Sequence, residues 1–134
     1  MTIEADLVGI LRASTSVTAY TSTQRIYQEF LPQNATIPAV SYFLVSAPRI
    51  PLMGSDAVNI QARYQFDCWA ATPSSANGLT NAVLGAIERY GPSSSGTVAI
   101  ETIFIDDVQS VDEDDPDEKV FRRSIDAIVC YRSS

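Results

Sequence analysis

Histidine is absent from the 134-residue sequence, and this absence excludes several kinds of chemistry. Histidine is the commonest general base, the usual activator of a serine or cysteine nucleophile, and the commonest metal ligand. A Ser-His-Asp triad and a Cys-His dyad are therefore impossible in this chain. The two common phosphate-binding loops, GxGxxG and GxxxxGK[ST], are also missing. We expect a protein that is not an enzyme and needs no cofactor, although an active site of lysine, tyrosine or carboxylates stays open.

Cysteine is scarce, with only Cys68 and Cys130, and both fall inside predicted strands. Two distant cysteines without histidine are too few for a zinc site. They are predicted to be small buried hydrophobic side chains. The alternative is a cross-strand disulfide, which would need an oxidising compartment.

Basic residues are few as well, because 9 Lys and Arg stand against 16 Asp and Glu, for a net charge of −7. This balance argues against sequence-specific recognition of nucleic acid, which needs cations for the phosphates, and against docking on anionic membranes. No stretch approaches the roughly 20 apolar residues of a membrane span, and the N-terminus does not resemble a signal peptide. We expect a protein that is made in a cytoplasm and has no membrane partner.

The apolar content of 46% and the length predict one globular domain over residues 1–134. Helices are predicted over residues 3–13 and from Thr72-Pro73 onward, where threonine is the N-cap and proline the first helical residue. Residues 13–23 are rich in serine and threonine and are predicted to form a turn. Strands are predicted over residues 25–27, 39–46, 58–69, 97–108 and 119–132.

Two of these strands alternate between apolar and polar residues, which is typical of an antiparallel sheet with one buried face. We therefore expect an α+β fold in the order α-β-β-β-α-β-β, a two-layer sandwich with two helices on one face of a mostly antiparallel sheet. Trp69 is expected to pack under the start of the second helix. The polar face is interpreted either as a contact between subunits or as plain solvent-exposed surface; its residues are Asn59, Gln61, Arg63, Gln65, Arg122, Asp126 and Arg132.

Eight of the 16 acidic residues lie between Asp106 and Glu118, and residues 110–118 are predicted to be a loop joining the last two strands. The loop is interpreted as a solvated connection, as a divalent-cation site, or as an acidic surface that repels phosphate or meets a basic partner. A calcium loop fits poorly, because Pro116, Asp117 and Arg123 stand where an EF-hand needs a ligand, a glycine and a glutamate. The candidate residues are Asp112, Glu113, Asp114, Asp115, Asp117 and Glu118.

The loop 48–57 holds three apolar residues, Ile50, Leu52 and Met53, between prolines and a glycine. These side chains either fold back onto the core or form an exposed patch, which would mark a binding surface. They are the candidate contact with a neighbouring subunit or with a tube.

The order of several weak motifs suggests a family. Arg25-Ile26-Tyr27 follows the first helix, and a loop with Pro32 and Pro38 leads into the strand that begins at residue 39. The segment 65–70 (Gln-Phe-Asp-Cys-Trp-Ala) runs directly into the second helix, and the acidic loop precedes a closing strand over 123–131. Over residues 3–132 the chain resembles the tail-completion, or tail-terminator, proteins of long-tailed, siphovirus-like bacteriophages.

This resemblance implies a structural virion protein without a catalytic motif. Members of the family form a ring, typically a hexamer, on the last ring of the tail tube. The ring stops polymerisation of the tube and provides a docking surface for head-completion proteins of the neck. DNA passes through it without sequence-specific binding. The location implied is the tail or neck of the virion, after assembly in the host cytoplasm.

Two other functions stay open at this stage. One is a head-closure or adaptor subunit of the neck, which belongs to the same class. The other is a small cytoplasmic enzyme or ligand-binding α+β domain, against which the absence of histidine counts.

Overall fold

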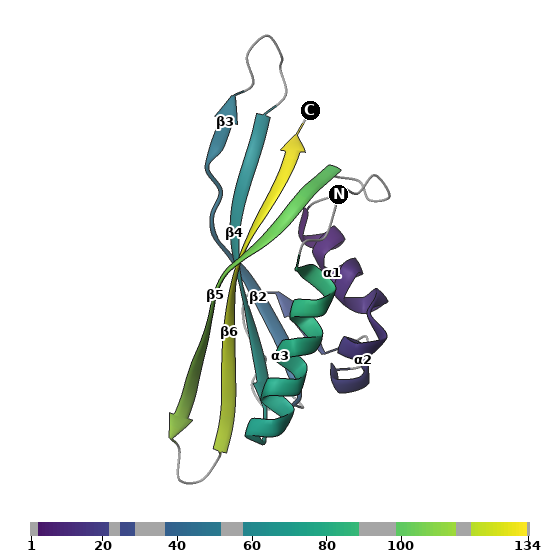
Figure 1. The fold of residues 1–134 in the computed structure, drawn as a ribbon, viewed down its shortest axis with the longest axis vertical. Coiled ribbons are helices and arrows are strands. Elements are labelled where there is room, and N and C mark those ends of the chain that lie inside the picture. The colour runs from purple at the N-terminus through teal and green to yellow at the C-terminus, as the bar shows by residue number, and fades with distance from the viewer. Residues whose placement is uncertain are drawn as a thin grey trace.

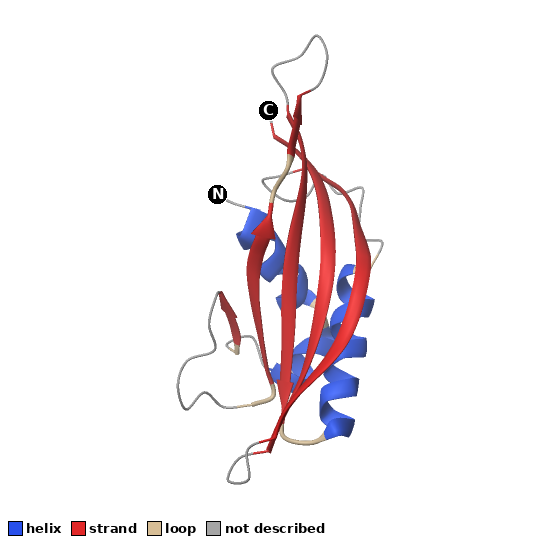
Figure 2. Ribbon diagram, turned by 90° about the vertical axis from the view of Figure 1, so that its left-hand side faces the viewer, coloured by secondary structure: helices blue, strands red, loops and turns tan. Residues whose placement is uncertain are grey.

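The computed structural model describes residues 3–21, 25–28, 37–51, 58–88, 99–114 and 119–133. Its elements, in chain order, are α1 (Ile3–Ala13), α2 (Thr15–Thr21), β1 (Ile26–Gln28), β2 (Ala39–Ser46), β3 (Arg49–Pro51), β4 (Val58–Ala70), α3 (Pro73–Ile87), β5 (Ala99–Asp114) and β6 (Lys119–Ser133). The helices cover one face of an elongated, twisted sheet (Figures 1 and 2). The predicted α+β class is confirmed, with three described helices in place of the two expected.

The strands lie in the order β1-β2-β4-β6-β5, and β3 pairs with the part of β4 that extends past β2. The β2–β4, β3–β4, β4–β6 and β5–β6 pairs are antiparallel, whereas β1 and β2 are parallel. β4 and β6 are the long central strands, and they pair from Val58↔Ser133 to Ala70↔Phe121. The face opposite the helices is called the outer face below.

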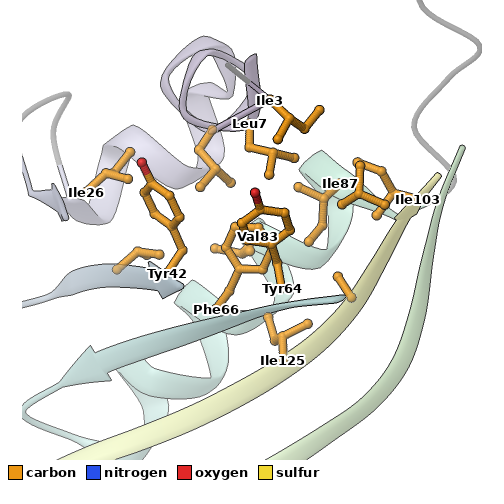
Figure 3. Close-up of a cluster of buried hydrophobic side chains, with 14 of the residues drawn as sticks. Ile3, Leu7, Ile26, Tyr42, Tyr64, Phe66, Val83, Ile87, Ile103 and Ile125 are labelled. Atoms are coloured by element: carbon orange, nitrogen blue, oxygen red, sulfur yellow. The ribbon is translucent and has the colours of Figure 1, made fainter. Parts of the chain in front are cut away.

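The alternation of β4 is observed as predicted. Its inward side chains Ile60, Ala62, Tyr64, Phe66 and Cys68 are buried. Ile125, Ala127 and Val129 of β6 are buried on the same side. Figure 3 shows this cluster between the sheet and the helices, where Leu7 of α1 and Val83 and Ile87 of α3 approach Tyr64 and Phe66. Burial of each large apolar side chain in this cluster contributes about 1.5–3 kcal/mol, so the face that packs on the helices dominates stability.

α3 begins as the sequence indicates. The Thr72 hydroxyl accepts a hydrogen bond from the Ser75 N–H at 3.2 Å, and Pro73 occupies the first turn. This cap satisfies one of the helix's free N–H donors. One face of α3 is buried on β4 and β6, through Ala76, Leu79, Thr80, Val83 and Ile87.

The prediction of a turn over residues 13–23 is wrong, because residues 15–21 form α2. Their hydroxyls bond within the helix: Thr18 Oγ1 donates to the Ser14 carbonyl at 3.1 Å and Thr21 Oγ1 to the Val17 carbonyl at 3.3 Å. Such local bonds make serine and threonine ambiguous between turns and helices. Burial of Val17 and Thr21 in the core then favours the helix. α2 also lies close to α3, since a Cβ at Gly78 would overlap the Tyr20 hydroxyl.

Arg25 connects α2 to the start of β2. Its guanidinium donates to the Tyr20 carbonyl at 2.8 Å and to the Pro38 carbonyl at 3.0 Å, and the Ile37–Pro38 peptide is cis. The Arg25 carbonyl accepts the Val40 N–H at 3.0 Å. The Arg-Ile-Tyr motif therefore places the short parallel strand β1 against β2.

Cys68 and Cys130 are not joined by a disulfide bond. On β4 and β6, Cys68 is opposite Arg123 and Cys130 is opposite Gln61, so the two cysteines are separated by seven steps along β4. At about 3.3 Å per residue this separation is roughly 23 Å, far beyond the reach of a disulfide. The cross-strand disulfide is excluded.

Candidate assembly surface

The outer face of the sheet carries a buried polar cluster where β2, β4 and β6 meet. Asp67 is only 5% exposed, although it lies on the polar face of β4. Its Oδ1 accepts from Ser124 Oγ at 2.6 Å and from Gln65 Nε2 at 2.9 Å. A buried carboxylate is tolerated when it is hydrogen-bonded in this way. This end of the outer face is therefore an ordered surface rather than a set of independent solvated side chains.

Trp69 lies beside this cluster, and its expected position under α3 is wrong. Its Nε1 donates to Ser41 Oγ at 3.0 Å, and the Arg122 guanidinium lies over the indole ring at 5.1 Å from its centroid. The reason is the strand period of two: Cys68 points toward the helices, so Trp69 points away. Arg123 points the other way from Arg122 and donates to Asn77 of α3 at 3.2 Å.

Further along the outer face, Arg63 Nη1 and Asp106 Oδ2 form an ion pair at 2.7 Å. The hydrogen bond to Asp106 raises the pKa of the Arg63 guanidinium above its usual value. Both side chains are substantially exposed, so the pair contributes little to stability. It joins the central strand β4 to the edge strand β5 across β6.

The acidic segment is not the loop predicted over residues 110–118, because residues 110–114 continue β5. Asp112, Glu113 and Asp114 pair with Phe121, Val120 and Lys119 of β6, and backbone pairing holds them although their charges favoured a loop. Asp115, Asp117 and Glu118 lie outside the described residues. The pairs Glu113↔Val120 and Asp114↔Lys119 extend past Ala70, where β4 ends. They therefore belong to a two-stranded hairpin of β5 and β6.

Of the apolar loop predicted over residues 48–57, the structure describes residues 48–51. Ile50 lies in β3 opposite Asn59, and residues 48–51 are therefore not wholly a loop. Leu52 and Met53 lie outside the described residues. Figure 1 shows β3 at one end of the sheet and the end of β5 at the other. The two candidate segments are separated by most of the 15 residues of β6, or roughly 45 Å.

Four exposed large apolar side chains were missed by sequence reasoning. In the part of the chain whose burial is described, they are Leu44 (44% exposed) and Val45 (49%) of β2, and Phe104 (56%) and Val108 (42%) of β5. The two β2 residues lie at the break in register between Leu44 and Ser46. The two β5 residues lie on either side of the break in register between Ile105 and Asp107. A bulge disrupts the alternation on which the sequence prediction depends. No pattern in the sequence marks these positions.

Within the described residues there is no group of three or more Cys, Asp or Glu side chains that could hold a metal ion. None of the described helices is long and apolar enough to cross a membrane.

Comparison with known proteins identifies the family. Residues 5–132 match the family model described as "Tail completion protein gp17". No curated protein matches the chain. Among solved structures, the fold is similar to a chain in the "Virion of native gene transfer agent (GTA) particle", with a TM-score of 0.62 and 13% identity, over 94% of this chain and 90% of that chain. The sequence match covers nearly the whole chain, so the chain belongs to the tail completion protein gp17 family and is a structural protein of a phage tail, located in the virion.

Proposed function

We propose that this protein forms a ring, with six copies as the expected number, on the last ring of the tail tube. The ring stops tube polymerisation and provides the docking surface for the head-completion proteins of the neck. DNA passes through the ring without sequence-specific binding. The observation that carries the proposal is the match to the tail-completion family over residues 5–132.

The shape of the sheet supports a subunit with two different ends. The β3 end and the β5–β6 hairpin lie at opposite ends of the long central strands (Figure 1). A ring of such subunits, with the strands running along the ring axis, has two chemically distinct axial faces. One face can then contact the tube and the other the neck.

The test is complementation of particles that lack the protein, with tail lengths measured by electron microscopy. Without the protein, tails should be longer than normal and variable in length. The wild-type chain should restore a single length and joining to heads. Tails of normal length that fail to join heads would indicate the head-closure or adaptor function instead.

The β5–β6 hairpin is proposed to face the ring lumen or an axial surface next to it. Three of the candidate carboxylates, Asp112, Glu113 and Asp114, belong to the end of β5. The other three, Asp115, Asp117 and Glu118, follow them in the sequence. Carboxylates along a DNA channel repel phosphates, which prevents DNA from binding the wall as it passes.

The hairpin is tested by changing Asp112, Asp114 and Asp115 together to asparagine. The particles should assemble with normal tails but eject DNA more slowly. A matched variant with glutamate at the same three positions keeps the charge and should eject normally. Normal ejection by the asparagine variant would leave the lumen role without support.

The apolar segment is proposed to contact a neighbouring subunit or the tube. Changing Leu52→Asp together with Met53→Asp should prevent ring formation or tube capping, because charges would be placed in an apolar contact. Leu52→Ile with Met53→Leu keeps the apolar character and serves as the control. Normal rings and normal tail lengths with the aspartate pair would exclude this contact.

A further inference from the structure

The exposed apolar side chains of the sheet lie on its two opposite edges. Phe104 and Val108 belong to β5, which is the last strand in the described sheet order. Leu44 and Val45 belong to β2, past the point where β1 pairs with residues 40–42. Exposed apolar side chains at a sheet edge can mark an interaction site. The pair Leu44 and Val45 is called the β2 patch below. Phe104 alone is called the β5 patch: Phe104 is opposite Ile128, whereas Val108 is opposite the buried Ile125 and therefore lies on the other face of the sheet.

The strand registers place the two patches at the same level of the sheet. Leu44 is opposite Tyr64, Tyr64 is opposite Ala127, and Ala127 is opposite Ile105, which is the neighbour of Phe104. In the next row, Ser46 is opposite Arg63, Arg63 is opposite Ile128, and Ile128 is opposite Phe104. Val45 falls between these two rows. The patches therefore have almost no offset along the strand direction.

The two edges also differ in charge. Residues 99–114 of β5 contain six acidic residues and no basic one, namely Glu101, Asp106, Asp107, Asp112, Glu113 and Asp114. On the other edge, the strands β1, β2 and β3 contain a single charged residue, Arg49, which is exposed. Two β5 edges brought together would place like charges opposite each other, which is destabilising. A β5 edge fits better against the neutral to basic edge of another copy.

We propose that the β2 patch of one copy packs against the β5 patch of the next, and that this contact joins the ring. The proposal rests on the ring function above and names the surfaces that form it. A cyclic assembly of more than two copies needs a head-to-tail contact between two different patches. When the ring axis runs along the strands, patches at one level let the contact close on itself, whereas an offset would generate a rising helix.

The contact is formed by side chains rather than by addition of a strand. At the bulge of β5, Asp107 Oδ1 accepts the N–H of Val108 at 2.9 Å, and Asp107 Oδ2 accepts from Gln109 Nε2 at 2.7 Å. The Val108 donor is thereby occupied, and a charge lies at the edge. Both features disfavour pairing with a further strand. The side chain of Phe104, which precedes this bulge, stays available to a partner.

Disulfide cross-linking tests the contact directly. A chain with Val45→Cys, Phe104→Cys and Cys130→Ser is incorporated into particles and then oxidised; Cys68 is buried and stays in place. Non-reducing gels should show a ladder of cross-linked chains that ends at the ring number. The control carries Gln61→Cys in place of Phe104→Cys, on the exposed centre of the outer face, and should stay monomeric. Particles that assemble normally but give no ladder overturn the contact.

A charge exchange provides a second readout that needs no oxidation. Val45→Asp alone and Phe104→Lys alone should each lower the fraction of terminated tails by about tenfold, which corresponds to about 1.4 kcal/mol. The double variant Val45→Asp/Phe104→Lys places opposite charges across the contact and should restore most of the loss. Single variants that terminate tails normally, or a double variant without rescue, overturn the contact. Neither result affects the ring function, which fails only if the wild-type chain does not restore tail length.

Discussion

At the scale of single residues, Asp67 shows how a charged side chain becomes part of the packed structure. It lies on the face of β4 that points away from the helices, yet its carboxylate is buried and accepts hydrogen bonds from Ser124 and Gln65. A carboxylate in this position links β4 to β6 through side chains in addition to the backbone ladder. The outer face is thereby held in one conformation near Trp69.

Removal of the Asp67 carboxylate should destabilise the fold. Asp67→Ala leaves the Ser124 hydroxyl and the Gln65 amide without their acceptor, and we expect a loss of about 1–3 kcal/mol in the free energy of unfolding. Urea denaturation followed by circular dichroism measures the change. Gln61→Ala, on the same face of the same strand but exposed, should change stability by less than about 0.5 kcal/mol. Equal effects of the two variants would mean that the cluster contributes nothing.

Cys68 makes stability depend on pH in the alkaline range. Burial raises the pKa of its thiol from 9.0 to about 12, partly opposed by a hydrogen bond with Thr80. Above pH 9 the unfolded thiol loses its proton while the folded thiol keeps it, so the native state binds more protons and stability falls as pH rises. The loss is spread between about pH 9 and pH 12, at up to about 1.4 kcal/mol per pH unit.

Cys68→Ala should therefore remove part of the alkaline destabilisation. The free energy of unfolding, measured at pH 8 and at pH 10.5, should fall more steeply in the wild type than in this variant. Cys130→Ala leaves Cys68 in place and should keep the wild-type slope. Identical slopes in all three chains would show that the Cys68 thiol ionises without cost to the fold.

At the scale of elements, some boundaries can be read from local sequence signals, whereas others depend on packing or on strand pairing. α3 has a threonine cap, a proline in the first turn and a single buried stripe, and each of these is readable from the sequence. α2 has no such stripe, and its hydroxyls permit either a turn or a helix until the core covers Val17 and Thr21. β5 is longer than its hydrophobic pattern because its acidic end is held by pairing with β6.

The cap of α3 gives an element-scale prediction. Thr72→Ala removes the acceptor of the Ser75 N–H and should lower the free energy of unfolding by about 1 kcal/mol. Thr72→Ser retains a hydroxyl acceptor and should stay close to the wild type. Thermal and urea unfolding of both variants measures the difference. A serine variant as unstable as the alanine variant would assign the effect to the lost methyl group instead of the cap.

At the scale of the whole molecule, stability is concentrated in the middle of the sheet. β4 is paired on both sides, by β2 and β6, and its inner side chains pack on the helices. The β5–β6 hairpin past Ala70 has two strands only among the described residues. A two-stranded hairpin is marginally stable by itself. The molecule thus combines a rigid centre with an end whose order depends on what it contacts.

Hydrogen exchange should report this gradient in the isolated chain. Backbone amides near Phe66 and Ile125 should exchange only through global unfolding, and amides near Glu113 and Val120 should exchange several orders of magnitude faster through local opening. Mass spectrometry of peptides from the two regions measures the difference. In assembled particles, the hairpin amides should slow down if a neighbour covers them. Equal protection of both regions in the isolated chain would contradict the gradient.

Taken by itself, the sequence determines the class of fold, the buried faces of β4 and β6, the start of α3 and the family. These properties depend on the local period of apolar residues, on helix capping and on the order of the elements, and all three can be read from the sequence. The tertiary structure alone decides that Asp67 is buried, that Trp69 lies away from the helices, and that residues 110–114 form a strand. It also decides that Leu44, Val45 and Phe104 lie exposed at one level of opposite edges. The physical reason is that bulges and pairing partners, set by residues far apart in sequence, determine the exposure of each side chain.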